Sequence, residues 1–331
     1  MNYRSVAELN RGARRLSHGV PRGVDLVVGI PRSGLLAANL LCLNLDVPMT
    51  DVEGLCEERV LQTGHRHEGE VSFDDVERVL VVDDSVDSGR QMRETKAQLA
   101  EKNLDFDIEY AAVYISSKGH QFVDYWVEVV DKPRVFEWNV MHHPDLKHSC
   151  VDIDGILCRD PTREENDDGS RYREFLRTVE PRVVPTETIG WLVTCRLEKY
   201  REETEAWLNE HGVEYENLVM MDHPSKEARQ RAGNHAEYKA DVYRNTDTKL
   251  FIESSPRQAG VICERSKQPV LCYETNELMK PGCVDRIQNK STDYVTQFSE
   301  DPVAFSLKAS KYVLSESYYT ASRMMQTHLR K

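Results

Sequence analysis

The sequence feature that most constrains the fold is a short apolar run that leads directly into acidic residues. Positions 79–82 read VLVV, and Asp83, Asp84 and Asp87 follow before a helical stretch that runs to about residue 102. A run of this kind is typical of a strand that is buried on both faces of a parallel sheet. The carboxyl ends of such strands meet the amino ends of the following helices, whose unpaired N–H groups favour a phosphate. We therefore predict an α/β fold with an anion site after residue 82.

A second strand of the same type is predicted at residues 24–30 (VDLVVGI), after an amphipathic helix at residues 5–18. The strand is stopped by Gly29 and Pro31, and a helix is predicted from about residue 34 to 44. The turn between them reads Pro-Arg-Ser-Gly. Alone, such a turn most often only reverses the chain, but together with the acidic loop about 50 residues later it indicates a binding site.

The segment VLVVDDSVDSGRQM resembles the phosphoribosyl diphosphate (PRPP) signature of type I phosphoribosyltransferases. The resemblance implies that Asp83 and Asp84 hold the ribose 2′ and 3′ hydroxyls, and that Asp87 also takes part in catalysis. It assigns the 5′-phosphate loop to Asp87, Ser88, Gly89, Arg90 and Gln91. Carboxylates suit this role because they accept two hydroxyl hydrogen bonds and favour positive charge that develops at C1 of the ribose.

The segment GIPRSGLLAA resembles the loop that binds the pyrophosphate leaving group in the same family. The resemblance assigns pyrophosphate binding to Pro31, Arg32, Ser33 and Gly34. A polar segment at residues 58–70 suits the mobile lid of that family, and Arg66 within it is a further expected pyrophosphate ligand, although a solvated loop is nearly as good an interpretation. Residues 118–144 resemble the hood over the acceptor base. There Phe136 and Trp138 are candidates to stack on a base, core packing is the alternative, and the identity of the acceptor stays open.

The second half of the chain opens with another apolar strand that carries acidic residues. Residues 141–149 are polar and predict a linker with solvated histidines, and Cys150-Val151-Asp152-Ile153-Asp154-Gly155 follows. Carboxylates at positions i and i+2 lie on the same side of a strand's mouth. That geometry suits a nucleophile, Asp152, and its proton donor, Asp154.

The segment DIDGIL resembles motif one of the haloacid dehalogenase (HAD) superfamily, and three further segments resemble the later motifs in the family's order. The resemblance implies an aspartyl-phosphate mechanism in which Thr194 and Lys239 bind the phosphoryl oxygens. It assigns the cofactor Mg²⁺ to Asp152, Asp154, through its carbonyl, and Glu253. A cation and a lysine are needed because an anionic carboxylate must approach an anionic phosphate.

Three details qualify the HAD resemblance. Ser254 follows Glu253 where family members often carry a second acid, so either metal affinity is reduced or a nearby acid substitutes. Lys226 is a rival to Lys239, which we prefer because its segment leads into the helix before the motif-four strand. The short spacing between the motifs leaves little room for a cap, so the site either accepts a bulky substrate or is covered by another part of the chain.

The composition excludes several other classes. Of the 331 residues, 40% are hydrophobic and 30% are charged, which favours a folded chain over disorder. The net charge of −13 opposes non-specific binding to nucleic acid or to an anionic membrane, and no apolar run is long enough to span a bilayer. The eight cysteines form no CxxC pair and are interpreted as reduced thiols, which predicts a cytoplasmic protein.

These observations predict two doubly wound parallel-sheet domains followed by a mostly helical extension. The boundaries are 1–145 for the phosphoribosyltransferase-like domain, 149–270 for the HAD-like domain with little or no cap, and 271–331 for the extension. The predicted function is phosphoribosyl transfer from PRPP to a nucleobase or similar small acceptor, with a phosphatase that acts on the product or on another phosphorylated small molecule. The alternative is an independent phosphatase joined to a non-catalytic PRPP or nucleotide sensor. The resemblance to phosphoribosyltransferases also implies a homodimer that forms through the first domain.

Overall fold

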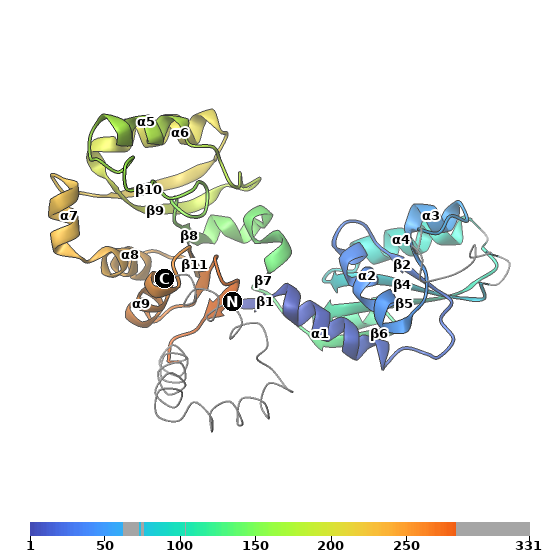
Figure 1. Ribbon diagram of the computed structural model, residues 1–331. Helices are drawn as coiled ribbons and strands as arrows, with labels where there is room; N and C mark the ends of the chain where they lie inside the picture. Colours follow the sequence, from blue (N-terminus) through green and yellow to red (C-terminus); the bar gives the residue numbers. More distant parts are fainter. Residues whose placement is uncertain (62–72, 74–75, 103, 283–331) are drawn as a thin grey trace, which may run out of the picture.

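The computed structural model describes residues 1–61, 73, 76–102 and 104–282 (Figure 1). Within them, the first sheet is parallel and runs in the order β3 (Met49–Asp51), β2 (Leu26–Gly29), β4 (Arg78–Val86), β5 (Asp107–Ile115) and β6 (Tyr125–Val129). Its helices are α1 (Val6–Ser17), α2 (Ser33–Leu45), α3 (Val52–Cys56) and α4 (Arg90–Ala100). The strand–helix pairs predicted around the two loops are confirmed.

Strand β4 is buried on both faces, as its unbroken apolar run predicts. Leu80 and Val82 pack into the core cluster that includes residues of α1 and α2, whereas Val79 and Val81 pack into the cluster on the opposite face. Successive side chains of a strand point to opposite faces, so one apolar run fills two cores. The strand continues to Val86, which means that the acidic pair lies within it and not after it.

The second sheet runs in the order β10 (Tyr215–Met221), β9 (Ile189–Leu197), β8 (Ser149–Val151), β11 (Leu250–Glu253), β12 (Val270–Cys272) and β13 (Glu277–Met279). All pairs are parallel except β12 with β13. Its helices are α5 (Ser170–Thr178), α6 (Arg201–Glu210), α7 (Lys226–Ala232), α8 (His235–Arg244) and α9 (Pro256–Ser266). The carboxyl ends of the central strands β8, β9 and β11 therefore lie side by side, which is where the sequence motifs end.

The sheet continues past the boundary expected at residue 271. Strand β12 and the antiparallel strand β13 both belong to it, so the described start of the expected extension is part of the second sheet. A loop links β12 to β13 and lets β13 cover the sheet edge. The helical run expected at residues 303–328 lies outside the described residues.

A two-stranded parallel ribbon joins the two halves. It consists of β1 (Asn2–Arg4) and β7 (Arg134–Phe136), and it lies between the two sheets in Figure 1. Tyr3 and Val135 pack into a core cluster of the second half, whereas Phe136 packs into a cluster of the first. The Tyr3 hydroxyl also donates a hydrogen bond of 3.1 Å to the Asn276 carbonyl. The hood strand β7 therefore contributes to the cores of both domains.

The segment expected to be a solvated linker is packed. Residues 137–148 form two 3-10 helices, and Met141 and Leu146 are buried in the core cluster of the second half. His143 is half-buried and its Nδ1 accepts a hydrogen bond from the Asp145 amide. Apolar residues spaced among the polar ones anchor this connection, so the prediction of a solvated linker is wrong for Met141, His143 and Leu146.

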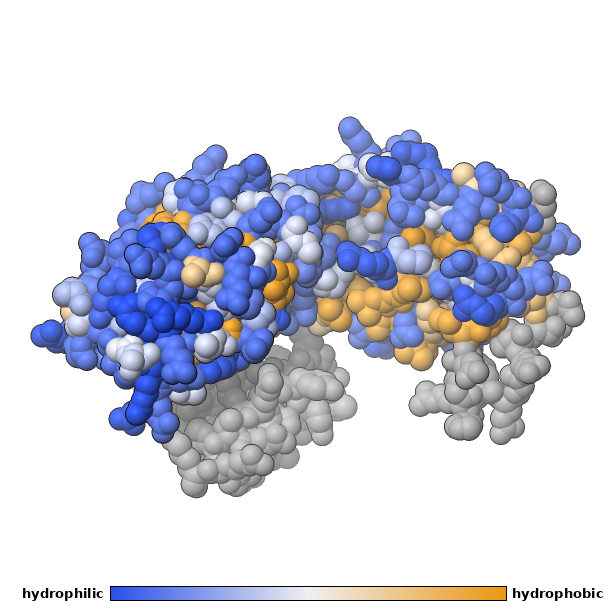
Figure 2. All heavy atoms as spheres, turned by 90° about the horizontal axis from the view of Figure 1, so that it is seen from above, coloured by the Kyte–Doolittle hydropathy of each residue, from blue (hydrophilic) through white to orange (hydrophobic). Residues whose placement is uncertain are grey.

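Apolar side chains are exposed mainly on the first domain. Figure 2 shows them gathered on that side of the molecule, and Leu43 at the outer face of α2 is 67% exposed. Helix α2 is apolar almost all round, unlike the amphipathic α1. Within the described ranges, none of the helices is both long and apolar enough to cross a bilayer.

Candidate functional site

The acidic pair at the end of β4 is buried and held by donors from two other segments. Asp83 and Asp84 are 8% and 5% exposed. The Ser33 hydroxyl, at the start of α2, donates to Asp84 Oδ1 at 2.7 Å, and the Trp138 indole N–H donates to Asp84 Oδ2 at 2.9 Å. The fold thus brings together the acidic loop, the Pro-Arg-Ser-Gly turn and the hood, as the sequence predicts.

The electrostatics of the pair follow from its burial. Burial, and then the charge of Asp84, raise the pKa of Asp83 well above its usual value. The Asp84 amide donates to Asp83 Oδ1 at 2.9 Å, which partly offsets this effect. Two buried carboxylates with spare lone pairs can accept hydrogen bonds from paired hydroxyls or bind a cation.

The turn before α2 lies directly against the acidic pair. A Cβ atom on Gly34 would lie 2.9 Å from the Val82 carbonyl oxygen and 3.0 Å from Asp83 Oδ1, so only glycine fits without a shift of the backbone. The peptide bond between Pro31 and Arg32 is cis, and both side chains are exposed. The expected pyrophosphate residue Arg66 lies outside the described residues.

The loop between β4 and α4 presents backbone amides and exposed polar side chains. Gly89 has φ +69°, and a Cβ atom there would lie 2.2 Å from the Phe122 ring. The other predicted 5′-phosphate residues after Asp87 are exposed at the amino end of α4: Ser88, Arg90 and Gln91. The Arg90 amide donates to the Ser88 hydroxyl at 3.4 Å, so the Gln91 and Met92 N–H groups that follow in the first turn are those available to an anion.

Asp87 is paired with cations from the hood. Lys132 Nζ lies 2.7 Å from Asp87 Oδ2, and Arg134 Nη2 lies 4.0 Å from Asp87 Oδ1. The Ser116 hydroxyl donates to the Asp87 carbonyl at 2.9 Å. Neither Lys132 nor Arg134 is singled out by the sequence, because the contact joins segments that are about 45 residues apart.

The two aromatic candidates of the hood have different surroundings. Phe136 is buried and packs against Tyr114 and Trp138, with ring centroids 5.6 and 4.8 Å apart, so it serves the core. The base-stacking prediction is therefore wrong for Phe136. Trp138 is partly exposed and donates to Asp84, a hydrogen-bonding role that the stacking prediction missed.

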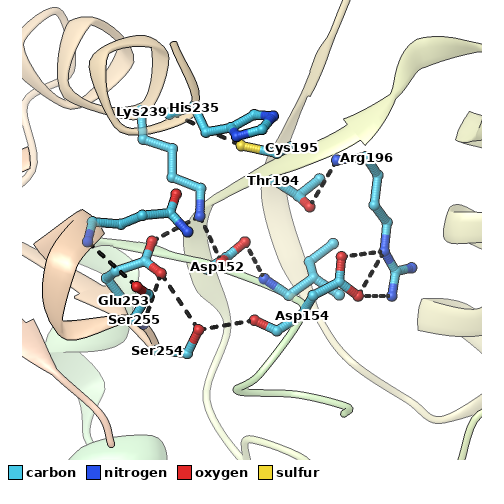
Figure 3. Close-up of polar contacts among 12 residues, drawn as sticks. Asp152, Asp154, Thr194, Cys195, Arg196, His235, Lys239, Glu253, Ser254 and Ser255 are labelled. Carbon is cyan, nitrogen blue, oxygen red and sulfur yellow. Dashed lines mark hydrogen bonds and ion pairs between the residues drawn. The ribbon is translucent and has the colours of Figure 1, made fainter. Parts of the chain in front are cut away.

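The second group of predicted residues meets at the ends of β8, β9 and β11 (Figure 3). Lys239 Nζ, from α8, lies 2.6 Å from Asp152 Oδ2 and 2.7 Å from Glu253 Oε2. All three side chains are buried. The preference for Lys239 over Lys226 agrees with this geometry, since Lys226 Nζ instead donates to the Asn166 carbonyl on a neighbouring loop.

Burial and charge oppose each other in this cluster. Burial raises the pKa of Asp152, Lys239 lowers it, and Glu253 and Asp154 raise it further, so the net shift is upward. For Lys239, burial lowers the pKa, but the charges of Asp152 and Glu253 outweigh it and the pKa rises. The lysine thus stays charged between two carboxylates.

Asp154 is held by an arginine that the sequence interpretation left without a role. Arg196 is fully buried; its Nη2 lies 2.7 Å from Asp154 Oδ1, and its Nε lies 3.2 Å from each carboxylate oxygen. Thr194, also buried, accepts a hydrogen bond from the Arg196 amide at 3.2 Å. Arg196 follows Thr194 by two residues on β9, so the period of the strand could have placed both on one face.

Ser254 stands where a second acid is expected, and its hydroxyl lies between two potential metal ligands. It donates to the Asp154 carbonyl at 3.3 Å and lies 3.4 Å from Glu253 Oε1. Asp160 is a candidate for a substitute acid, because a Cβ on Gly155 would meet both Ser254 and Asp160 Oδ2. Burial, and then Asp154, raise the pKa of Asp160.

The oxygen donors fit Mg²⁺ in chemistry, although the Asp152 and Glu253 carboxylates are paired with Lys239. The Asp154 carbonyl and Glu253 Oε1 both face the Ser254 hydroxyl, and hard oxygen ligands are those that Mg²⁺ prefers. The Asp154 carboxylate is instead taken by Arg196. In the part of the chain that the structure describes, no group of three acid, histidine or cysteine side chains is arranged to hold a metal.

Comparison with known proteins gives three kinds of result. No curated protein matches the chain. Among solved structures, the xanthine-guanine-hypoxanthine phosphoribosyltransferase of Helicobacter pylori is 19% identical, with a TM-score of 0.34, and the match covers 42% of this chain and 93% of that one. The purine phosphoribosyltransferase of Pyrococcus horikoshii is 22% identical, with a TM-score of 0.32, and the match covers 41% of this chain and 92% of that one. Residues 2–144, which contain the acidic pair and the loops around it, match the phosphoribosyl transferase domain family.

Proposed function

We propose that residues 2–144 catalyse phosphoribosyl transfer from PRPP to a nucleobase or a similar acceptor. The observation that carries this proposal is the 2.7 Å contact between Ser33 and Asp84, because it joins the predicted pyrophosphate loop to the predicted ribose site. A PRPP molecule has its ribose hydroxyls, 5′-phosphate and pyrophosphate on one small ring. The loops that bind them must therefore lie within a few ångströms of one another.

In the proposed reaction the chain mainly positions PRPP and stabilises charge. Asp83 and Asp84 accept hydrogen bonds from the ribose hydroxyls and stabilise the positive charge that develops at C1 as pyrophosphate leaves. The amides of residues 88–91 bind the 5′-phosphate at the start of α4. The turn at Ser33 and Gly34 binds pyrophosphate, and the close packing of Gly34 sets its distance from the acids.

Release of pyrophosphate from PRPP, with a screen of bases and amines as acceptors, tests this function. We expect Asp84→Asn to lower the rate by about a hundredfold or more, because the amide presents N–H donors to a hydroxyl and carries no charge. Asp107→Asn is the matched control, since Asp107 is exposed at the opposite end of the same sheet. Equal rates for wild type and Asp84→Asn would show that the acidic pair does not bind the reacting ribose.

We further propose that the second half is a phosphatase of the HAD type. The support is the contact of Asp152 with Lys239 at the mouth of the central strand, beside Thr194 on the neighbouring strand. In this proposal Asp152 attacks phosphorus, and Lys239 and Thr194 bind the phosphoryl oxygens. Bound Mg²⁺, held by Asp152, the Asp154 carbonyl and Glu253, would supply positive charge that lowers the repulsion between carboxylate and phosphate.

Arg196 would act as a positioning residue in that phosphatase. Its three contacts fix the orientation of Asp154, which is proposed to exchange a proton with the leaving oxygen. Phosphate release from generic phosphate esters tests the assignment. We expect Asp152→Asn to abolish it and Asp241→Asn, an exposed acid on the helix that carries Lys239, to leave it unchanged. Phosphate release that survives in Asp152→Asn would exclude Asp152 as the nucleophile.

The two reactions can act in sequence, since the first product carries the 5′-phosphate that the second site would remove. The test compares phosphate release from that product with release from simple phosphate esters. A higher kcat/KM for the transferase product would support consecutive steps. Equal values would favour two independent activities on one chain.

A further inference from the structure

Helix α7 adds no buried side chain to the core of the second domain. It lies at the edge of that domain in Figure 1, and polar contacts link it to the neighbouring segments. The Lys226 amide donates to Asp168 Oδ2 at 3.0 Å. Arg229 Nη1 donates to the Cys195 carbonyl at 2.5 Å. Hydrophobic burial therefore does not explain the position of α7, whereas the placement of its polar side chains does.

The contact with Cys195 brings Arg229 beside the proposed phosphatase site. Cys195 directly follows Thr194 on β9, and its thiol donates to the His235 carbonyl at 3.9 Å (Figure 3). His235 lies one turn before Lys239 on α8, so these two side chains share a face of the helix. Burial, and then the charges of Arg229 and Lys239, lower the pKa of His235, which places both cations near its ring.

Two polar atoms of this group are buried without a partner. Within the described residues, Arg229 Nε and His235 Nε2 have no hydrogen-bond partner. The Cys195 carbonyl occupies only one of the five donors of the guanidinium. A neutral imidazole can donate from one ring nitrogen and accept at the other. Because unpaired buried polar groups are costly, a ligand that supplies acceptors here would gain binding energy from both side chains.

The scissile phosphate has other partners in the proposed site, namely Lys239 and Thr194. The charges of Lys239 and Arg196 are also balanced, because both contact carboxylates of the site. In the described part of the chain, Arg229 forms no ion pair, and the partner of its guanidinium is the neutral Cys195 carbonyl. An arginine without a balancing acid attracts an anion, and its planar fork matches phosphate and carboxylate oxygens.

We propose that Arg229 and His235 bind a second anionic group of the phosphatase substrate. The preferred substrates are then small phosphate esters that carry a further phosphate or carboxylate. This inference rests on the proposed phosphatase function and narrows the class of its substrate. Loss of a charge-assisted contact of this kind lowers affinity by about ten- to a hundredfold.

The experiment uses the full chain with Mg²⁺ and three matched pairs of phosphate esters, in which the second compound carries an added anion. The pairs are fructose 6-phosphate and fructose 1,6-bisphosphate, adenosine 5′-monophosphate and adenosine 3′,5′-bisphosphate, and glycerol 3-phosphate and 3-phosphoglycerate. The third pair adds a carboxylate and the others add a phosphate. Initial rates of phosphate release give kcat/KM for each compound. Calorimetric titration of the Asp152→Asn variant, which prevents turnover, gives its affinity.

The substitutions compared are Arg229→Gln, Arg229→Lys and His235→Leu. Arg231→Gln is the matched control, because Arg231 is exposed on the same helix and loses the same charge. Each substitution is measured alone for kcat/KM and together with Asp152→Asn for affinity.

We expect the wild type and Arg231→Gln to prefer the compound with the added anion by at least about tenfold in at least one pair. In Arg229→Gln this preference falls to within about threefold, while kcat/KM for the compound without the added anion changes little. Arg229→Lys keeps part of the preference because it keeps the charge, and His235→Leu lowers the preference by about fivefold.

The inference is overturned if no pair shows a preference, or if the preference survives in Arg229→Gln or in His235→Leu. Equal weakening of both compounds of each pair in Arg229→Gln would show a merely structural role and would also overturn it. Arg229-dependent binding of the added anion without phosphate release would uphold the inference and refute the phosphatase function. Phosphate release with no preference in any pair would do the reverse.

Discussion

Replacement of Lys239 by methionine should destabilise the second domain strongly. The ammonium group of Lys239 is buried and contacts two buried carboxylates, at 2.6 Å from Asp152 and 2.7 Å from Glu253. Methionine keeps the aliphatic volume but leaves both carboxylates buried without a cation. The change in the free energy of unfolding therefore reports the loss of the charge and not a change in packing.

The magnitude follows from these distances. At an effective dielectric constant of about 20, each contact contributes roughly 6 kcal/mol of Coulomb energy. Desolvation of the ammonium, which the variant no longer requires, offsets much of the gain from the two contacts, so the net loss expected in Lys239→Met is that of removing one buried partner, about 3–5 kcal/mol. Adding Glu253→Gln removes one of the two stranded charges and should recover about half of that loss.

Urea unfolding of the full chain measures the effect. Replacing Trp126 and Trp138 by phenylalanine leaves Trp191 and Trp207, both in the second half, as the only tryptophans, so fluorescence then reports on that domain alone. Lys226→Met is the matched control and should cost about 1 kcal/mol or less, since the Lys226 ammonium donates to the Asn166 carbonyl and not to a buried carboxylate. A loss below 1 kcal/mol in Lys239→Met, or a double variant no more stable than the single one, would refute the charge argument.

Two further predictions concern the first domain. Trp138→Phe should raise the KM for PRPP about three- to tenfold, because Asp84 loses the indole N–H that orients it; an unchanged KM in steady-state pyrophosphate assays would contradict that role. Gly89→Ala should weaken PRPP binding in titration calorimetry, because the added Cβ atom overlaps the Phe122 ring and residue 89 has a positive φ. Adding Phe122→Ala removes the overlap but not the strained φ, so it should restore only part of the affinity. Wild-type affinity in Gly89→Ala alone would show that the loop moves freely.

The local elements were predictable because their causes are local. Ser5 caps α1 through a reciprocal contact with Glu8, a pattern that is visible in the sequence, and the alternating burial of β4 follows from its apolar run. The meeting of Ser33 with Asp84 was also predictable, since both lie at the carboxyl ends of neighbouring parallel strands. The prediction of the site thus depended on the order of the strands more than on the contacts of individual side chains.

The contacts that the sequence did not predict all join distant segments. Trp138 reaches Asp84 and Arg134 approaches Asp87 only because β7 returns the chain to the first sheet, where Phe136 packs against Tyr114, and no local pattern encodes that path. The packed 3-10 segment at residues 137–148 was mistaken for a linker because its polar residues outnumber the few apolar anchors. Contacts with distant parts of the chain decide whether such a segment is packed or solvated.

The central claim is that the acids at the end of β4 hold the ribose of PRPP, and calorimetric titration of the full chain with PRPP and Mg²⁺ tests it most directly. We expect saturable binding by the wild type and by Asp107→Asn, and affinity at least about tenfold weaker in Asp84→Asn, where the buried carboxylate is lost. Equal affinity in Asp84→Asn and wild type, or no binding of PRPP by either, would contradict it.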